Sequence, residues 1–244
     1  MKRIIVIPAR FGSVRLPGKP LLDLNGRPLI QWVYEGARRS RLTDEVIIAT
    51  DDERIRDAAS SFGAPVVMTS PECTSGTDRI WEAIQDREAD VIVNLQGDEP
   101  QIRGDMIDTL IEAVEAEGLP MATLRAYLSE THDYRSPHTV KVVIDCNGFA
   151  LYFSRAPIPF MQRTTAIPLF KHIGIYAFSR SFLETFVALP KGRLEEVESL
   201  EQLRALEAGY RIKTLLVDYE GVGIDTENDL ARARQILQNP ARPS

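Results

Sequence analysis

The sequence predicts an α/β fold in which a doubly wound, mainly parallel sheet carries an antiparallel insertion. Two observations predict it. In the first half of the chain, short apolar runs alternate with amphipathic helical patterns, which is typical of a parallel sheet covered by helices on both faces. From residue 122 onward several strand-like runs follow one another, and Asn147-Gly148 separates two of them with the turn that favours a hairpin.

The strands of the first half are predicted from continuous apolar runs. Residues 4–7 (IIVI), 45–50 (EVIIAT) and 91–95 (VIVNL) lack the alternation of a half-exposed strand. Each run should therefore be buried on both faces, as the central strands of a parallel sheet are.

Three helical patterns lie around these strands. Residues 28–41 begin with a proline, which suits the first helical position. Asp51 or Asp52 can cap a second helix that runs through Ser61. Residues 77–87 predict a third helix with one apolar face.

The second half predicts a mainly antiparallel insertion around residues 122–190, followed by elements that return to the core. The expected strands are residues 122–127, 140–145, 149–153, 171–178 and 211–217. We expect one long helix over residues 193–208, ended by Gly209, and a final helix from Thr226 to residue 238. Residues 1–238 should form a single domain, and residues 239–244 a flexible tail.

Composition narrows the function classes. The 244 residues carry a net charge of −6, which argues against nucleic acid or an anionic membrane surface as a partner. No apolar run is long enough to span a bilayer, and Cys73 and Cys146 lie in no metal or redox motif. We therefore expect a soluble, cytoplasmic protein whose cysteines are small buried residues or chance surface thiols.

The segment after the first strand is the strongest functional signal from the residues alone. Arg10, Arg15 and Lys19 are three cations within ten residues, and Gly12 and Gly18 let a ligand approach the backbone. Ligands of open parallel sheets bind beyond the carboxyl ends of strands, and clustered cations suit a polyphosphate. The spacing matches neither the Walker A motif nor the GxGxxG fingerprint.

Two aspartates are candidates for a metal site. Asp98 follows the strand VIVNL, and Asp225 lies in a glycine-rich turn before the last helix. Mg²⁺ prefers one or two carboxylates together with phosphate oxygens and water. On pattern alone, a turn residue and a residue beside a helix cap explain these positions equally well.

Seven segments resemble the sugar-acid cytidylyltransferases, in the order found in that family, from Ile4 to about Leu237. They are IPARFGSVRLPGKPL, TSGTDR, NLQGDEP, LYFSRAPIP, KHIGIYAF, LEEVESLEQLR and GVGIDTENDL. The resemblance implies a Rossmann-like nucleotidyltransferase domain. It also implies transfer of CMP from CTP to the anomeric hydroxyl of 3-deoxy-D-manno-octulosonate (Kdo), with release of pyrophosphate. Mg²⁺ as cofactor, a homodimer and a place in lipopolysaccharide biosynthesis are implied as well.

The resemblance also implies roles for individual residues. The triphosphate and cytidine side matches Ala9, Arg10, Arg15, Lys19, Thr74, Ser75, Gly76 and Gln96. Arg10, Lys19, Asp98 and Asp225 match the catalytic positions, and the last two match the metal ligands. The sugar side matches Gln96, Arg155, His172, Tyr176, Glu198 and Gln202. Because both substrates are anions, we expect Arg155 and His172 to act as cations beside the three in the first loop.

Rival functions remain open at this point. Cytidylyltransferases for 8-amino-Kdo, N-acylneuraminate or methylerythritol phosphate share much of the pattern, although KHIGIYAF and LEQLR favour Kdo over the last two. A non-catalytic nucleotide-binding regulator would not need the paired aspartates. A glycosyltransferase would release a nucleotide instead of pyrophosphate.

Overall fold

The computed structural model describes residues 1–12, 16–128, 131–163, 167–221, 223–224 and 226–238. The chain divides into two compact units, which are residues 1–111 with 221–244 (unit 1) and residues 112–220 (unit 2). The predicted tail at residues 239–244 lies outside the described residues.

Unit 1 contains a parallel sheet with the strand order β6-β1-β4-β5. These strands are β1 (Arg3–Ala9), β4 (Glu45–Thr50), β5 (Val66–Met68) and β6 (Val91–Leu95). The side chains of Ile4, Ile5 and Ile7 in β1 are fully buried, as the continuous apolar run predicts. The three strands predicted in this half are therefore confirmed.

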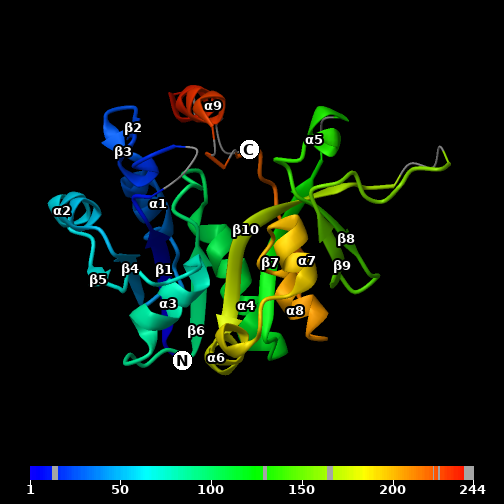
Figure 1. Cartoon of the computed structure of the whole chain (residues 1–244), viewed down its shortest axis with the longest axis horizontal. Helices are drawn as coiled ribbons and strands as arrows, with labels where there is room; N and C mark the ends of the chain where they lie inside the picture. Colours follow the sequence, from blue (N-terminus) through cyan, green and yellow to red (C-terminus); the bar gives the residue numbers. More distant parts are fainter. Residues whose placement is uncertain (13–15, 129–130, 164–166, 222, 225, 239–244) are drawn as a thin grey trace. The chain divides into compact units, whose positions relative to one another are not determined.

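The helices of unit 1 lie where the sequence predicts them, but Pro28 precedes the first helix instead of starting it, and this helix ends at Ala37 instead of residue 41. They are α1 (Leu29–Ala37), α2 (Glu53–Ser61), α3 (Gly76–Ile84) and α9 (Glu227–Gln238), and α4 (Gly104–Glu117) crosses the division between the units. Asp52 caps α2 by accepting a hydrogen bond from the Arg54 N–H. Figure 1 shows α9 beside the short hairpin of β2 (Asp23–Leu24) and β3 (Arg27–Pro28). There, Leu24 packs in a buried cluster with Leu230.

Unit 2 is built on antiparallel pairs with one parallel addition. Its strands are β7 (Met121–Tyr127), β8 (Lys141–Ile144), β9 (Ala150–Ser154), β10 (Phe170–Ser179) and β11 (Lys213–Leu216). β7 pairs antiparallel with β10 and parallel with β11, and β8 pairs antiparallel with β9 and β10. The predicted hairpin is present, with Gly148 at a φ of 78° in its turn. The predicted α/β class, with parallel and antiparallel strands, is confirmed.

The helices of unit 2 are α5 (Thr131–Arg135), α6 (Arg180–Ala188), α7 (Arg193–Glu198) and α8 (Leu203–Glu207). The prediction of one long helix over residues 193–208 is therefore wrong. The helix ends because Ser199 adopts a left-handed conformation with a φ of 52°, and the Leu200 N–H then bonds to the Glu195 carbonyl oxygen.

The cause of this break lies in contacts that are distant in sequence. The Glu198 carboxylate accepts hydrogen bonds from the Ser154 hydroxyl at 2.6 Å and from the Arg155 N–H at 2.9 Å, both at the end of β9. After the break, the Arg204 guanidinium makes two hydrogen bonds to the Glu195 carboxylate, at 2.6 and 2.8 Å. A local helical pattern contains no sign of either attachment.

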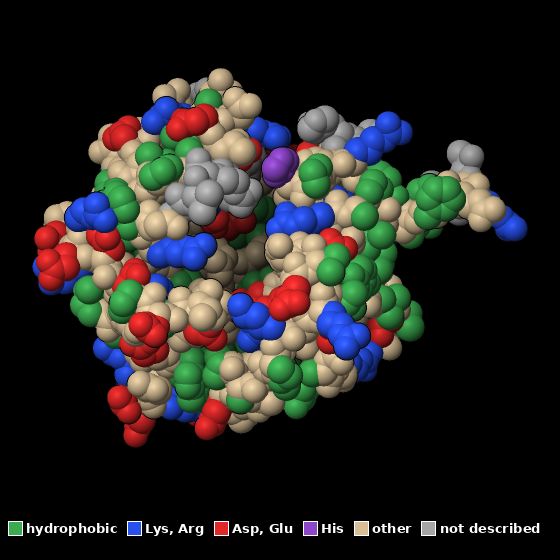
Figure 2. All heavy atoms as spheres, in the orientation of Figure 1, with side chains coloured by type: hydrophobic (Ala, Val, Ile, Leu, Met, Phe, Trp, Pro, Cys, Tyr) green, Lys and Arg blue, Asp and Glu red, His purple; other side chains and the backbone are tan. Residues whose placement is uncertain are grey.

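Surface charge agrees with the composition. On the face shown in Figure 2, Lys and Arg side chains are interspersed with Asp and Glu side chains, without a broad field of one sign. Among the described residues, no helix combines the length and apolar character needed to cross a bilayer.

Candidate active site

A pocket of about 470 Å³ lies at the carboxyl ends of β1 and β6 in unit 1. Every predicted nucleotide-side residue that the structure describes lines it, together with Asp98. These residues are Ala9, Arg10, Lys19, Thr74, Ser75, Gly76, Gln96 and Asp98. The rule that ligands bind beyond strand ends predicted Arg10, Lys19 and Asp98 at this edge of the sheet, whereas the other lining residues were assigned from the family resemblance. Arg15 and Asp225 lie outside the described residues.

The loop after β1 is closed by a contact between its two ends. The Gly18 N–H bonds to the Phe11 carbonyl oxygen at 3.0 Å, and Gly18 has a φ of 69° that favours glycine. A Cβ atom at Gly18 would lie 3.0 Å from the Phe11 ring, so the glycine also provides space. The Arg54 guanidinium lies 3.3 Å from the centroid of that ring and covers it. This packing fixes the backbone immediately before Lys19.

Lys19 and Asp98 form the central polar contact of the pocket. The Lys19 ammonium lies 2.6 Å from Asp98 Oδ2, and the two side chains are 15% and 31% exposed. The Ile224 N–H bonds to the Asp98 carbonyl oxygen at 3.0 Å. The first loop, the turn after β6 and the segment before the last helix therefore meet at Asp98.

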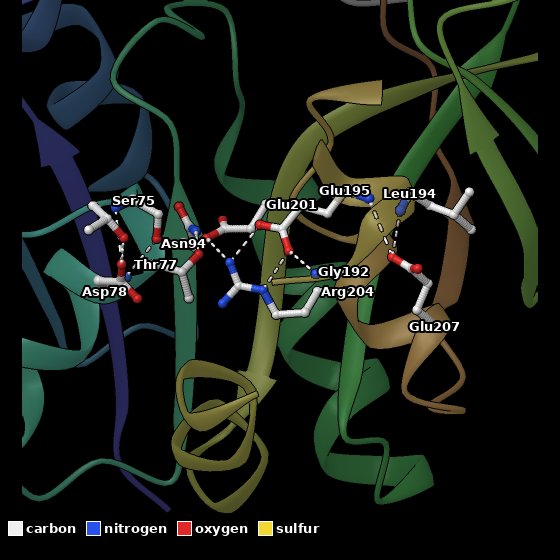
Figure 3. Close-up of polar contacts among 11 residues, drawn as sticks. Ser75, Thr77, Asp78, Asn94, Gly192, Leu194, Glu195, Glu201, Arg204 and Glu207 are labelled. Atoms are coloured by element: carbon white, nitrogen blue, oxygen red, sulfur yellow. Dashed lines mark hydrogen bonds and ion pairs between the residues drawn. The ribbon is translucent and has the colours of Figure 1, made fainter. Parts of the chain in front are cut away.

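The N-terminus of α3 forms another wall of the pocket. Ser75 caps this helix, because its hydroxyl accepts from the Asp78 N–H while the Asp78 carboxylate accepts from the Ser75 N–H. The Thr74 hydroxyl donates to the same carboxylate at 2.6 Å, and Figure 3 shows Ser75 and Asp78 facing each other. The side chains of Thr74 and Ser75 thus order the helix start, whose backbone N–H groups favour negative charge.

Gln96 is oriented by a chain of buried amides and hydroxyls. Its Nε2 donates to Asn94 Oδ1 at 2.7 Å, and Asn94 Nδ2 donates to the Thr77 hydroxyl at 3.3 Å. One N–H of the Gln96 amide is used in this way, so its second N–H and its carbonyl oxygen remain to meet a ligand.

Two residues of the pocket wall received no role from the sequence. Arg79 is almost fully buried, donates to the Thr69 hydroxyl at 2.5 Å and lies 3.4 Å from Asp51. Cys73 donates to the Glu82 carboxylate at 3.0 Å. Burial, with this carboxylate nearby, raises the pKa of the Cys73 thiol to about 11. The sequence did contain a signal for Arg79. It belongs to the TSGTDR motif, whose first three residues line the same wall of the pocket.

The predicted sugar-side residues, apart from Gln96, lie in unit 2. Arg155 donates to the carbonyl oxygens of Pro137 at 3.0 Å and Glu198 at 2.8 Å. Together with the two bonds that Glu198 accepts from the end of β9, these contacts bring Arg155 and Glu198 into one cluster. The Arg155 guanidinium therefore holds backbone segments together in this structure.

His172 and Tyr176 are neutral groups on β10. Burial lowers the pKa of His172 to about 3 and raises that of Tyr176. The expectation that His172 acts as a cation is therefore wrong, because its ring packs edge-on against Phe153, at 4.9 Å between centroids. Gln202 is also buried, and its Nε2 has no hydrogen-bond partner within the described parts of the chain. A buried amide without a partner is costly, which points to a ligand group that completes it.

The start of α7 shows a second carboxylate network in unit 2. Figure 3 shows the Glu207 carboxylate beside the backbone of Leu194 and Glu195, whose N–H groups donate to it at 3.0 and 3.4 Å. Glu195 in turn accepts from the Gly192 N–H. A Cβ atom at Gly192 would overlap the Glu207 carboxylate, so a larger residue there would displace this carboxylate from the start of α7.

The donor set around Asp98 fits a divalent cation. Asp98 supplies carboxylate oxygens, which Mg²⁺ prefers, and the Lys19 ammonium already occupies a cation position beside one of them. The described residues contain no cluster of three or more His, Cys, Asp or Glu side chains that could hold a metal ion.

The cationic loop, the helix N-terminus and the carboxylate at the strand ends define a nucleotide-binding α/β protein. The chain belongs to the cytidylyltransferase family, because the model described as Cytidylyltransferase matches residues 4–213. The family membership predicted from these sequence segments is confirmed.

Relatives at high identity cover nearly the whole chain. The chain is 49% identical to the 3-deoxy-manno-octulosonate cytidylyltransferase of Thermodesulfovibrio yellowstonii, over 97% of this chain and 98% of the relative. It is 46% identical to the 8-amino-3,8-dideoxy-manno-octulosonate cytidylyltransferase of Shewanella baltica, over 97% and 99%. The solved structure of a CMP:2-keto-3-deoxy-manno-octonic acid synthetase complexed with CTP superposes with a TM-score of 0.93 and 44% identity, covering 99% of this chain and 100% of that one.

Proposed function

We propose that the chain transfers CMP from CTP to the anomeric hydroxyl of Kdo and releases pyrophosphate. The observation that carries the proposal is the pocket of unit 1, where eight residues predicted from cytidylyltransferase motifs line one cavity. Two comparisons support it: a 49% identical relative named for this sugar acid, and a 44% identical synthetase solved with CTP.

On the nucleotide side, the residues of the chain position and neutralise a triphosphate. Arg10 and Lys19 supply positive charge, and the N-terminus of α3 supplies backbone N–H groups. Gly97 lets the turn after β6 approach β1, since a Cβ atom there would lie 3.3 Å from the Pro8 carbonyl oxygen. In-line attack on the α-phosphorus needs positioning and charge stabilisation above all, and these groups provide both.

The pair of Lys19 and Asp98 gives this site two states. Without nucleotide the ammonium neutralises Asp98 at 2.6 Å. When the triphosphate binds, the ammonium exchanges the carboxylate for phosphate oxygens, and Asp98 becomes able to hold Mg²⁺. We propose that Asp98 and Asp225 are the protein ligands, because Ile224, which directly precedes Asp225, bonds to the Asp98 backbone. The ion, when bound, supplies Lewis-acid polarisation of the α-phosphate.

On the sugar side, we propose that Arg155, His172, Tyr176, Glu198 and Gln202 of unit 2 contact the sugar acid. The buried Gln202 amide supports this role, because its Nε2 lacks a hydrogen-bond partner among the residues that the structure describes. No side chain is assigned as general base.

A cytidylyltransferase for 8-amino-Kdo is the second candidate. A relative named for that substrate is 46% identical, which is close to the 49% of a relative named for Kdo. The two sugars differ at one terminal substituent, so few contacts decide between them.

We further propose a cytoplasmic homodimer that acts in lipopolysaccharide biosynthesis. Hydrophobic side chains gather where Figures 1 and 2 together place β8, β9 and α7. Leu151 in β9 and Val197 in α7 are 62% and 85% exposed, which is unusual for large aliphatic residues. Sedimentation of the wild type and of Val197→Glu tests the dimer: a wild-type monomer contradicts it.

Pyrophosphate release from CTP tests the proposed reaction. Wild type, Asp98→Ala and the matched surface variant Asp57→Ala are assayed with Mg²⁺ and with Kdo, 8-amino-Kdo or N-acetylneuraminate. Asp57 is exposed and pairs with the adjacent Arg56, so its loss should leave activity intact.

We expect wild type and Asp57→Ala to release pyrophosphate with Kdo, and Asp98→Ala to release none. EDTA should abolish the release. Faster turnover of 8-amino-Kdo than of Kdo would identify 8-amino-Kdo as the substrate and would leave the proposed transfer of CMP unchanged. CTP binding without release from any sugar acid would contradict the proposed function and favour a regulator.

A further inference from the structure

One buried hydroxyl on β7 has three polar neighbours on β10. Thr123 Oγ1 lies 2.7 Å from the Ile175 carbonyl oxygen, 3.3 Å from the Ile173 carbonyl oxygen and 2.9 Å from Nε2 of His172. Thr123 is fully buried, so no water competes for its single proton. The pairing between β7 and β10 is irregular between Ile173 and Tyr176, and the hydroxyl lies beside this bulge.

The proton count at Thr123 determines the tautomer of His172. A carbonyl oxygen only accepts hydrogen bonds, so the short contact to Ile175 requires the hydroxyl proton. Toward His172 the Thr123 oxygen is then an acceptor, and the proton between them belongs to Nε2. Because burial lowers the pKa of His172 to about 3, the ring is neutral and carries no second proton. Nδ1 is therefore a bare acceptor.

The ring is also held in orientation. Phe153 packs edge-on against it at 4.9 Å between centroids, and Tyr176 lies at 5.4 Å. Among the described residues Nδ1 has no hydrogen-bond partner, and the side chain is only half-buried. The site thus presents one acceptor atom of fixed direction that is reachable by a donor.

We propose that Thr123 is a positioning residue that holds neutral His172 as the Nε2–H tautomer, so that Nδ1 accepts a hydrogen bond from a hydroxyl group of the sugar acid. This inference rests on the proposed function, because that function places the sugar acid at His172. Thr123 itself touches no substrate and acts through the histidine. A hydroxyl donor fits this arrangement, whereas a carboxylate of the substrate would meet a lone pair and be repelled.

Nitrogen-15 NMR of the histidine rings tests the tautomer directly. The chain has only three histidines, and the spectrum of His172→Gln assigns the signal. We expect wild type to show a protonated Nε2 and an unprotonated Nδ1. Thr123→Val removes the hydroxyl at nearly constant shape and should mix the tautomers, whereas Thr123→Ser should keep the wild-type pattern. A protonated Nδ1 in wild type, or an unchanged pattern in Thr123→Val, would overturn the proposal.

Steady-state kinetics test the sugar contact separately. We expect Thr123→Val to raise KM for the sugar acid about 10-fold with little change in KM for CTP, and Thr123→Ser to restore it, since one lost hydrogen bond costs about that much. The matched control is Thr214→Val. Thr214 is equally buried, pairs with Thr123 in the sheet and donates to the Gly148 carbonyl oxygen.

Thr214→Val should lower stability without changing the tautomer or the KM for the sugar. Equal effects of both valine variants on that KM would show a merely structural role and overturn the proposal. Wild type with the expected tautomer but no turnover of any sugar acid would contradict the proposed function and the sugar contact, and would leave the tautomer assignment standing.

Discussion

The polar sites of the two units differ in kind. In unit 1, opposite charges face each other in a solvent-accessible pocket, and Lys19 and Asp98 are 15% and 31% exposed. Of the candidate sugar-side groups in unit 2, Tyr176 and Gln202 are buried, His172 is half-buried, and all three are uncharged. A triphosphate and a metal ion require charges that change partners on binding. The hydroxyl groups of a sugar require neutral donors and acceptors of fixed direction, which burial provides.

The largest effect is expected from the loss of the Asp98 charge in unit 1. Asp98→Asn keeps the size of the side chain but loses the carboxylate that we propose for metal binding. We expect kcat to fall by about 10²–10³-fold, because charge stabilisation dominates such reactions. CTP affinity measured by calorimetry should change little, since Lys19 remains for the phosphates. Asp57→Asn is the control. An unchanged kcat in Asp98→Asn would contradict the proposal that unit 1 acts through its charges.

Unit 2 depends on buried polar contacts for stability, and Arg204 tests this. Arg204→Met leaves the Glu195 carboxylate buried without its bidentate partner, which typically costs about 3–5 kcal/mol of unfolding free energy. The matched variant Arg56→Met breaks an exposed pair with Glu53 and should cost less than about 1 kcal/mol. Urea denaturation compares the two, and equal losses would contradict the account.

The neutral histidine of unit 2 should appear in the pH dependence of stability. The pKa of His172 is about 3 in the folded state and 6.5 without the fold. Between these values the unfolded chain binds more protons, so this contribution is complete above about pH 6.5 and is lost as pH falls toward 3. We expect His172→Gln to reduce the rise of unfolding free energy between pH 4 and 6.5. An identical slope in the variant would mean that His172 is not buried as described.

The smallest effect is expected in cysteine reactivity, which tests whether CTP binds in the pocket that Cys73 lines. Cys73 lines the pocket and its pKa is raised to about 11, whereas Cys146 is exposed. With iodoacetamide at pH 8 we expect Cys146 to react several-fold faster, since thiolate is the reactive species. CTP should slow only the modification of Cys73, as followed by mass spectrometry. Protection of Cys146 alone would place the nucleotide elsewhere.

The elements predicted well from sequence are those fixed by local pattern. The runs at residues 45–50 and 91–95 match β4 and β6, because continuous burial leaves a continuous apolar signature. The convergence of Lys19 and Asp98 followed from the rule for strand ends. The break at Ser199 and the neutrality of His172 were missed, because each depends on partners far along the chain. Glu198 is held by the end of β9, and the His172 ring packs against Phe153.

A comparison of two single variants tests most directly whether unit 1 binds CTP and unit 2 binds the sugar acid. Lys19→Met removes a charge from unit 1, and Gln202→Leu removes a buried amide from unit 2. KM for CTP and KM for Kdo are measured for each by pyrophosphate release. The account predicts that Lys19→Met raises KM for CTP and leaves that for Kdo, and that Gln202→Leu does the opposite. Variants that raise both constants equally would contradict it.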